Sequence, residues 1–162
     1  MDKQEIIARI SNATPLGLLL ISYDLFLDAV AVTKENIASG EESAVIEKDI
    51  EYLQKILTEI TRSLNMEQEL SQEILPIYMH VNKLLIECGV KVKRKSQVKQ
   101  LSERINIIES IMKILLEGLE ALEDTGEPIN PAVQQVYAGL TYQKDGKLNE
   151  FVAEGSGRSF EA

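Results

Sequence analysis

The sequence contains few of the residue types from which metal centres and catalytic sites are built. It has no tryptophan, one cysteine (Cys88) and one histidine (His80) among 162 residues. A single cysteine cannot form an intramolecular disulfide, which favours a reducing compartment. Together the two residues fall short of the roughly four ligands that a structural zinc site needs. We therefore expect neither a disulfide nor a metal centre in this chain.

Sequence motifs of catalysis are missing as well. No glycine-rich phosphate loop, no GxSxG elbow and no HExxH pair occurs in the sequence. A di-iron bundle would need Glu-x-x-His pairs, but the residue three positions before His80 is Ile77. We expect a protein that is not an enzyme and that binds no cofactor.

Long apolar runs and an excess of positive charge are also missing. The longest apolar run, Leu18–Ile21, is far shorter than the ~20 residues of a membrane span, and the N-terminal residues are polar. We expect a cytoplasmic protein with no membrane insertion. The net charge of −9 argues against nucleic acid as a partner. A basic connector is expected over Val90–Lys95, and its charges, with that of Lys99 in the next helix, are interpreted as solvated.

The residues that are abundant indicate packed helices. Hydrophobic residues make up 44% of the chain and charged residues 27%, whereas aromatic residues make up only 5%. Apolar side chains recur at steps of three and four, which is the helical period. Thr14-Pro15 is a helix start, Ser39-Gly40 is a helix end, and Pro76 predicts a kink or a restart. Four helices are predicted, over about residues 15–39, 42–64, 68–88 and 96–122.

Four long helices with short connections predict an all-α fold, an antiparallel up-down four-helix bundle. We expect it to occupy residues 1–126 as one domain. Residues 127–162 differ in character and form a C-terminal extension. Asp145-Gly146 between two strand-like runs predicts a β-hairpin there, followed by a flexible Gly155–Gly157 segment.

The helices carry more apolar surface than such a bundle needs. A bundle helix requires an apolar stripe about 100° wide, yet the first helix is apolar around most of its circumference. The fourth helix has apolar residues beside its main stripe, namely Ile107, Ile111, Ile114 and Leu116. This surplus has to meet the C-terminal extension, a second copy of the chain or another protein.

Several short motifs resemble those of the flagellin-specific export chaperones of the FliS family. The resemblance begins with Ala13-Thr14-Pro15, Leu18 and Leu20-Ile21-Ser22-Tyr23-Asp24. It continues with Leu64-Asn65, Glu69-Leu70 and Ile77-Tyr78, in the same order and at similar distances, followed by Leu84 and Cys88. It covers about residues 11–122.

The resemblance implies a helical bundle in the bacterial cytosol that binds the C-terminal segment of flagellin, which is disordered when free. Binding in apolar grooves would prevent premature polymerisation, and a component of the flagellar type III export gate would then receive the complex. The candidate partner-binding residues are Leu18, Ile21, Tyr23, Ile60, Leu64, Ile77, Tyr78, Val81 and Leu84.

Two questions stay open at this point. Core and groove positions call for the same residue types, so the sequence does not assign each candidate to one or the other. The alternative function is a self-associating structural or adaptor bundle, a homodimer without a flagellin client.

Overall fold

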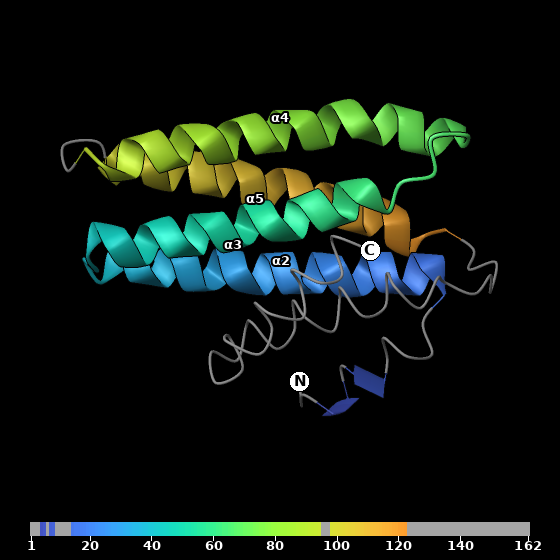
Figure 1. Ribbon diagram of the computed structural model, residues 1–162, viewed down its shortest axis with the longest axis horizontal. Helices are drawn as coiled ribbons and strands as arrows, with labels where there is room; N and C mark the ends of the chain where they lie inside the picture. The colour runs from blue at the N-terminus through green and yellow to red at the C-terminus, as the bar shows by residue number, and fades with distance from the viewer. Residues whose placement is uncertain (1–3, 6, 9–13, 95–97, 123–162) are drawn as a thin grey trace, which may run out of the picture. The chain divides into compact units, whose positions relative to one another are not determined.

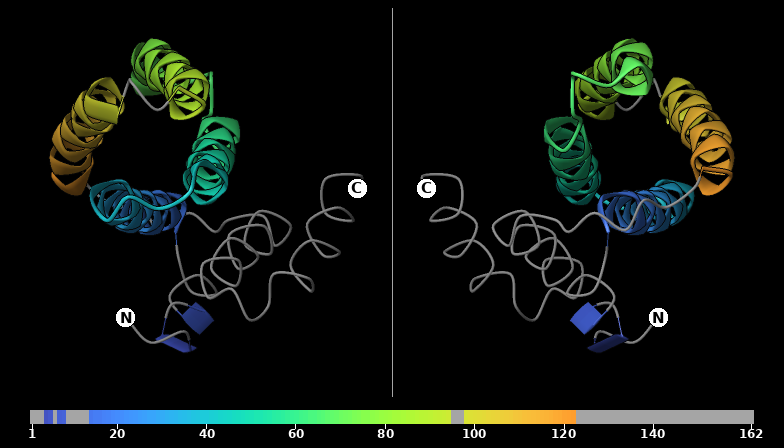
Figure 2. Two further views of the ribbon diagram at one scale, coloured as in Figure 1. Left: turned by 90° about the vertical axis from the view of Figure 1, so that its left-hand side faces the viewer. Right: turned by 90° about the vertical axis from the view of Figure 1, so that its right-hand side faces the viewer.

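The computed structural model describes residues 4, 5, 7, 8, 14–94 and 98–122. Its helices are α2 (Pro15–Ala38), α3 (Ser43–Arg62), α4 (Glu69–Val92) and α5 (Val98–Glu120). Within residues 23–118, consecutive helices run in opposite directions and lie side by side, and viewed along their axes they surround a common core (Figure 1, Figure 2). These residues contain no strand, so the predicted all-α four-helix bundle is confirmed.

The chain divides into two compact parts, and each is described by itself. Residues 23–118 contain most of the bundle. The other part comprises residues 1–22 and 119–162, so it includes the start of α2. The C-terminal extension, with the predicted hairpin and flexible segment, lies outside the described residues.

The first two helices begin and end much as the sequence predicts. Thr14 Oγ1 accepts a hydrogen bond of 3.1 Å from the amide of Gly17, as a capping hydroxyl does at a helix start. Pro15 is the first helical residue, where no amide donor is needed. Gly40 has φ +72°, the left-handed conformation that ends α2 at little steric cost.

The predicted end of the third helix at Cys88–Gly89 is wrong, because α4 continues to Val92. Gly89 lies inside the helix, where it costs about 1 kcal/mol relative to alanine. Val92 is buried, and this apolar contact extends the helix by another turn. The expected connector from Val90 is therefore helical over its first three residues.

The restart expected at Pro76 is also not observed, because α4 is continuous through this residue. A proline at position 76 leaves the carbonyl of Gln72 without its usual helical donor. Both Pro76 and Gln72 are exposed, so water can hydrate that carbonyl.

The core of residues 23–118 is built from one apolar stripe on each helix. The apolar stripe of α5 is buried at Leu101, Ile105, Ile108 and Met112, but Val98, the first residue of the helix, is about half exposed. The buried hydroxyl of Thr33 is satisfied within its own helix, where Thr33 Oγ1 donates a hydrogen bond of 2.8 Å to the carbonyl of Ala29. The largest fully buried side chains of this part are Tyr23, Tyr78, Phe26, Ile50, Leu53, Ile56, Ile60, Leu85 and Leu101.

Asp49 interrupts the apolar pattern of α3, and the structure explains this interruption. Asn36 Nδ2 of α2 donates a 2.7 Å hydrogen bond to Asp49 Oδ2. The bond is partly buried and joins two neighbouring helices, so it favours one register between them.

A pair of tyrosines links α2 to α4 inside the core. The hydroxyls of Tyr23 and Tyr78 are 2.6 Å apart, and the ring centroids are 6.4 Å apart with planes tilted by 52°. Burial, and then the neighbouring Tyr78, raise the pKa of Tyr23 far above its ordinary value. The Tyr23 hydroxyl therefore stays protonated, and the two rings add edge-type aromatic packing to the hydrogen bond.

Removing either hydroxyl should destabilise the bundle. We expect Tyr23→Phe and Tyr78→Phe each to lower the free energy of unfolding by about 1 kcal/mol, because each removes the buried hydrogen bond between the two hydroxyls. The free energy of unfolding of the double variant should fall by less than the sum of the decreases in the two single variants. Urea denaturation of all four proteins measures this coupling, and strictly additive losses would show that the hydrogen bond contributes nothing.

Candidate partner-binding surfaces

Apolar side chains remain exposed along the line where α4 and α5 lie side by side. The ion pair between Glu87 Oε2 and Arg104 Nε, at 2.8 Å, joins these two helices. The helices are antiparallel, so residues preceding Glu87 on α4 lie level with residues following Arg104 on α5 (Figure 1). This arrangement brings Ile77 to about the level of Ile114.

We define the α4–α5 apolar face as Ile77 together with Ile107, Ile111 and Ile114. The side chain of Ile114 is 68% exposed and that of Ile107 is 43% exposed. Ile77 and Ile111 are half-buried. Single exposed apolar residues are common on soluble proteins, but apolar residues that recur on one helix face are typical of an interaction surface, and Ile107, Ile111 and Ile114 recur at steps of four and three. The face could bind the apolar side of a partner helix.

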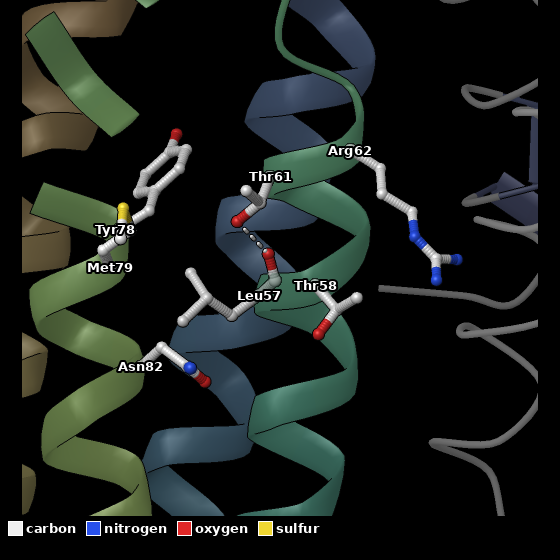
Figure 3. A pocket seen from close by; sticks show the side chains of 7 residues that line it. All are labelled: Leu57, Thr58, Thr61, Arg62, Tyr78, Met79 and Asn82. Carbon is white, nitrogen blue, oxygen red and sulfur yellow. Dashed lines mark hydrogen bonds between the residues drawn. The ribbon is translucent and has the colours of Figure 1, made fainter. Parts of the chain in front are cut away.

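A separate cleft of about 290 Å³ lies between α3 and α4 (Figure 3). Leu57 of α3 and Asn82 of α4 point toward it, and Met79, 64% exposed, lies at its edge. Thr61 Oγ1 donates a hydrogen bond of 2.7 Å to the carbonyl of Leu57, so the proton of this hydroxyl is already engaged within α3. The remaining residues of the cleft are Thr58, Arg62 and Tyr78.

Arg62 gives this cleft a charged edge. Its Nη1 lies 3.1 Å from Oε1 of Glu59, one turn earlier on the same helix. Figure 3 shows the guanidinium pointing away from α4. Burial raises the pKa of Glu59, while the charges of Arg62 and Lys55 lower it. The cleft is therefore more polar than the α4–α5 apolar face.

The nine candidate residues predicted from the sequence fall into two groups by exposure. Leu64 and Ile77 are half-buried, so a partner can reach them. The other seven are buried, with at most 7% of the residue exposed: Leu18, Ile21, Tyr23, Ile60, Tyr78, Val81 and Leu84. The structure brings Tyr23 and Tyr78 into direct contact, and Tyr78 also borders the α3–α4 cleft.

The candidate set did not include the most exposed apolar residues. The sequence indicates surplus apolar surface at Ile107, Ile111 and Ile114 but does not assign these residues to binding. No sequence pattern marks Met79 as a binding residue, because it lies outside the apolar stripe of α4. The sequence feature that identifies an exposed apolar surface is an isoleucine beside the core-facing stripe of a helix, rather than a residue within that stripe.

The single cysteine and the single histidine occupy different environments. Cys88 is fully buried, and burial raises the pKa of its thiol to about 11. His80 is exposed. Within the part of the chain that the structure describes, no three His, Cys, Asp or Glu side chains are grouped as metal ligands.

One prediction separates core positions from surface positions among the candidates. Ile60→Ala should lower the free energy of unfolding by about 3 kcal/mol, because it leaves a cavity in a closed core. Ile77→Ala should cost about 1 kcal/mol or less, because the half-buried site can be hydrated. Urea denaturation monitored by circular dichroism compares the two, and equal losses would contradict the assignment.

A second prediction concerns Cys88. Raising a thiol pKa to about 11 lowers the thiolate fraction at pH 8 about a hundredfold relative to a free cysteine, and burial blocks access as well. Alkylation at pH 8 should therefore be at least about a hundredfold slower in the native protein than in urea. Cys88→Ala provides the background rate, and rapid native labelling would show that the core opens at this position.

Helix α2 is long and apolar enough to cross a membrane, by length and composition alone. The short apolar run Leu18–Ile21 does not by itself predict this property. Half of the most apolar window of α2 is buried within the structure, as in the core helix of a soluble bundle.

Comparison with known protein families identifies a match. The family model described as "Flagellar protein FliS" matches residues 2–119. No curated protein and no solved structure matches the chain. The match covers well over half of the chain and includes all four described helices except the last residue of α5. The chain therefore belongs to the FliS family of flagellar export chaperones.

Proposed function

We propose that this protein is a cytosolic chaperone that binds the C-terminal segment of flagellin and prevents its premature polymerisation. The bound segment would then be delivered to a component of the flagellar type III export gate. Membership of the FliS family supports this function in general terms. The observation that carries the specific proposal is the α4–α5 apolar face, where Ile114 is the most exposed large hydrophobic residue of the described chain.

The binding mode follows from the chemistry of this face. A disordered segment that folds on binding must regain the conformational entropy that it loses, so it needs a large contact area. An amphipathic helix lying between α4 and α5 would cover Ile77 and Ile114 with its own apolar side. A second turn of the client could extend to Met79 and the α3–α4 cleft, because α4 borders both surfaces.

The buried candidates have an indirect part in this proposal. Tyr23, Ile60, Val81 and Leu84 hold the helices at their spacing and so set the width of the grooves. Ile77 contacts the client directly as part of the α4–α5 apolar face, and Tyr78 supports the wall of the α3–α4 cleft. Leu64 is half-buried and accessible just after α3, outside both surfaces. Leu18 and Ile21 support α2 in the same indirect way.

Substitution of the exposed face tests the proposal. Ile114→Glu should weaken binding of a flagellin C-terminal peptide by about tenfold or more, since it places a charge where the peptide would otherwise bury an apolar side chain. The free energy of unfolding should stay nearly unchanged, because the position is exposed. Val32→Glu on α2 is the matched control, an exposed apolar residue on another helix. Titration calorimetry should also give a negative heat capacity change for the unmodified protein.

Two results would contradict the proposal. Equal weakening by Val32→Glu would show that the α4–α5 apolar face has no special role. Absence of peptide binding, together with a dimer that persists on dilution in sedimentation experiments, would favour the self-associating alternative.

A further inference from the structure

A third depression, the end cleft, lies at the end of the bundle where α2 turns into α3 and where α4 ends and α5 begins. Its volume is about 760 Å³. Four buried apolar side chains belong to its lining, namely Ile37, Ile46, Val92 and Leu101. Val98, the first residue of α5, is 49% exposed beside them. A volume of this size is typical of sites that accept side chains of a ligand or peptide.

Basic residues gather on the α4 and α5 side of this cleft. In a chain with 26 acidic residues, none lies between Glu87 and Glu103. Lys91 lines the cleft, and its Nζ donates a hydrogen bond of 2.8 Å to Gln100 Oε1. Lys93 and Arg94 follow the lining residue Val92, and Lys99 follows the lining residue Val98. All three are exposed, and the described residues provide no ion-pair partner for them.

Helix electrostatics explain only part of this concentration. Lys91, Lys93 and Arg94 lie at the C-terminal end of α4, where positive charge is favourable. Lys99 is the second residue of α5, where positive charge is unfavourable, and the first turn of α5 has no acidic residue. Helix stability therefore does not account for Lys99, although a negatively charged partner would.

We propose that the end cleft is a docking site for an acidic peptide segment of another protein, one that carries a large apolar side chain among its carboxylates. The apolar side chain would enter between Val92 and Val98, and the carboxylates would contact Lys93, Arg94 and Lys99. The α2–α3 turn contributes Glu41 and Glu42 to the lining, so the cleft has an acidic and a basic side. This asymmetry orients the peptide, with its acidic residues toward the α4 and α5 ends.

An anionic lipid surface shares the negative charge of this ligand but fits less well. The net charge of −9 repels an anionic membrane beyond the immediate cluster. A concave apolar site with few charged groups suits one or two side chains rather than a flat surface. The proposal therefore commits to a peptide.

The test uses the full chain and a short fluorescent peptide, acetylated and amidated, with one phenylalanine and one leucine among glutamates. We expect binding that weakens as salt is raised. The double variant Lys93→Glu with Arg94→Glu should weaken it by about tenfold or more. Val98→Asp should also weaken it, and a peptide with lysines in place of glutamates should not bind.

The matched control is the double variant Lys83→Glu with Lys113→Glu, which makes the same change of charge on the exposed sides of α4 and α5. It should change peptide affinity less than about twofold. Equal weakening by both double variants would overturn the proposal, since binding would then follow net charge alone. Binding to vesicles containing phosphatidylserine without binding to the peptide would overturn it as well.

The end cleft is separate from the surfaces proposed for flagellin. Variants at Lys93 and Arg94 should leave the affinity for the flagellin peptide unchanged, while Ile114→Glu should leave the affinity for the acidic peptide unchanged. The two proposals therefore fail independently, and circular dichroism confirms the fold of each variant.

Discussion

Burial geometry limits each helix of a four-helix bundle to a single stripe facing the core, and this limit decides which surfaces are left for partners. Helix α3 stays close to the limit, with one buried stripe from Ile46 to Ile60. Helix α5 exceeds it, because its core positions are filled while Ile107 and Ile114 remain exposed. Apolar surface exposed along one helix face in this way is typical of a site that a partner covers.

The sequence predicted the helices well wherever local chemistry acts alone. Pro15 and Thr14 start α2, and Gly40 ends it, because each acts on the backbone of its own turn. The helix end predicted at Gly89 and the restart predicted at Pro76 are wrong because tertiary contacts and solvation outweigh helix propensity at these two positions. Burial of Val92 extends α4 past a glycine, and exposure of Gln72 lets the helix tolerate a proline. Helix boundaries therefore depend on the packed state, which a sequence pattern represents only in part.

The candidate surfaces were harder to predict, for a physical reason. Ile60, Ile77 and Ile114 are the same residue type on neighbouring elements, yet one is buried, one half-buried and one exposed. The difference lies in the rotation of each helix about its own axis, which is set by all of its neighbours together. A rotation of a few tens of degrees exchanges core and groove positions. The pattern could identify surplus apolar surface but could not locate it.

The separation of apolar and charged surfaces has a consequence for how two partners could bind at once. The α4–α5 apolar face runs along the side of the bundle, where a long amphipathic segment can accumulate contact area. The end cleft combines a small apolar lining with Lys93, Arg94 and Lys99, where a short segment gains affinity from charge. Salt should weaken binding at the end cleft and leave the apolar face largely unaffected. A chaperone built in this way could hold its client by area while a second protein recognises the loaded bundle by charge.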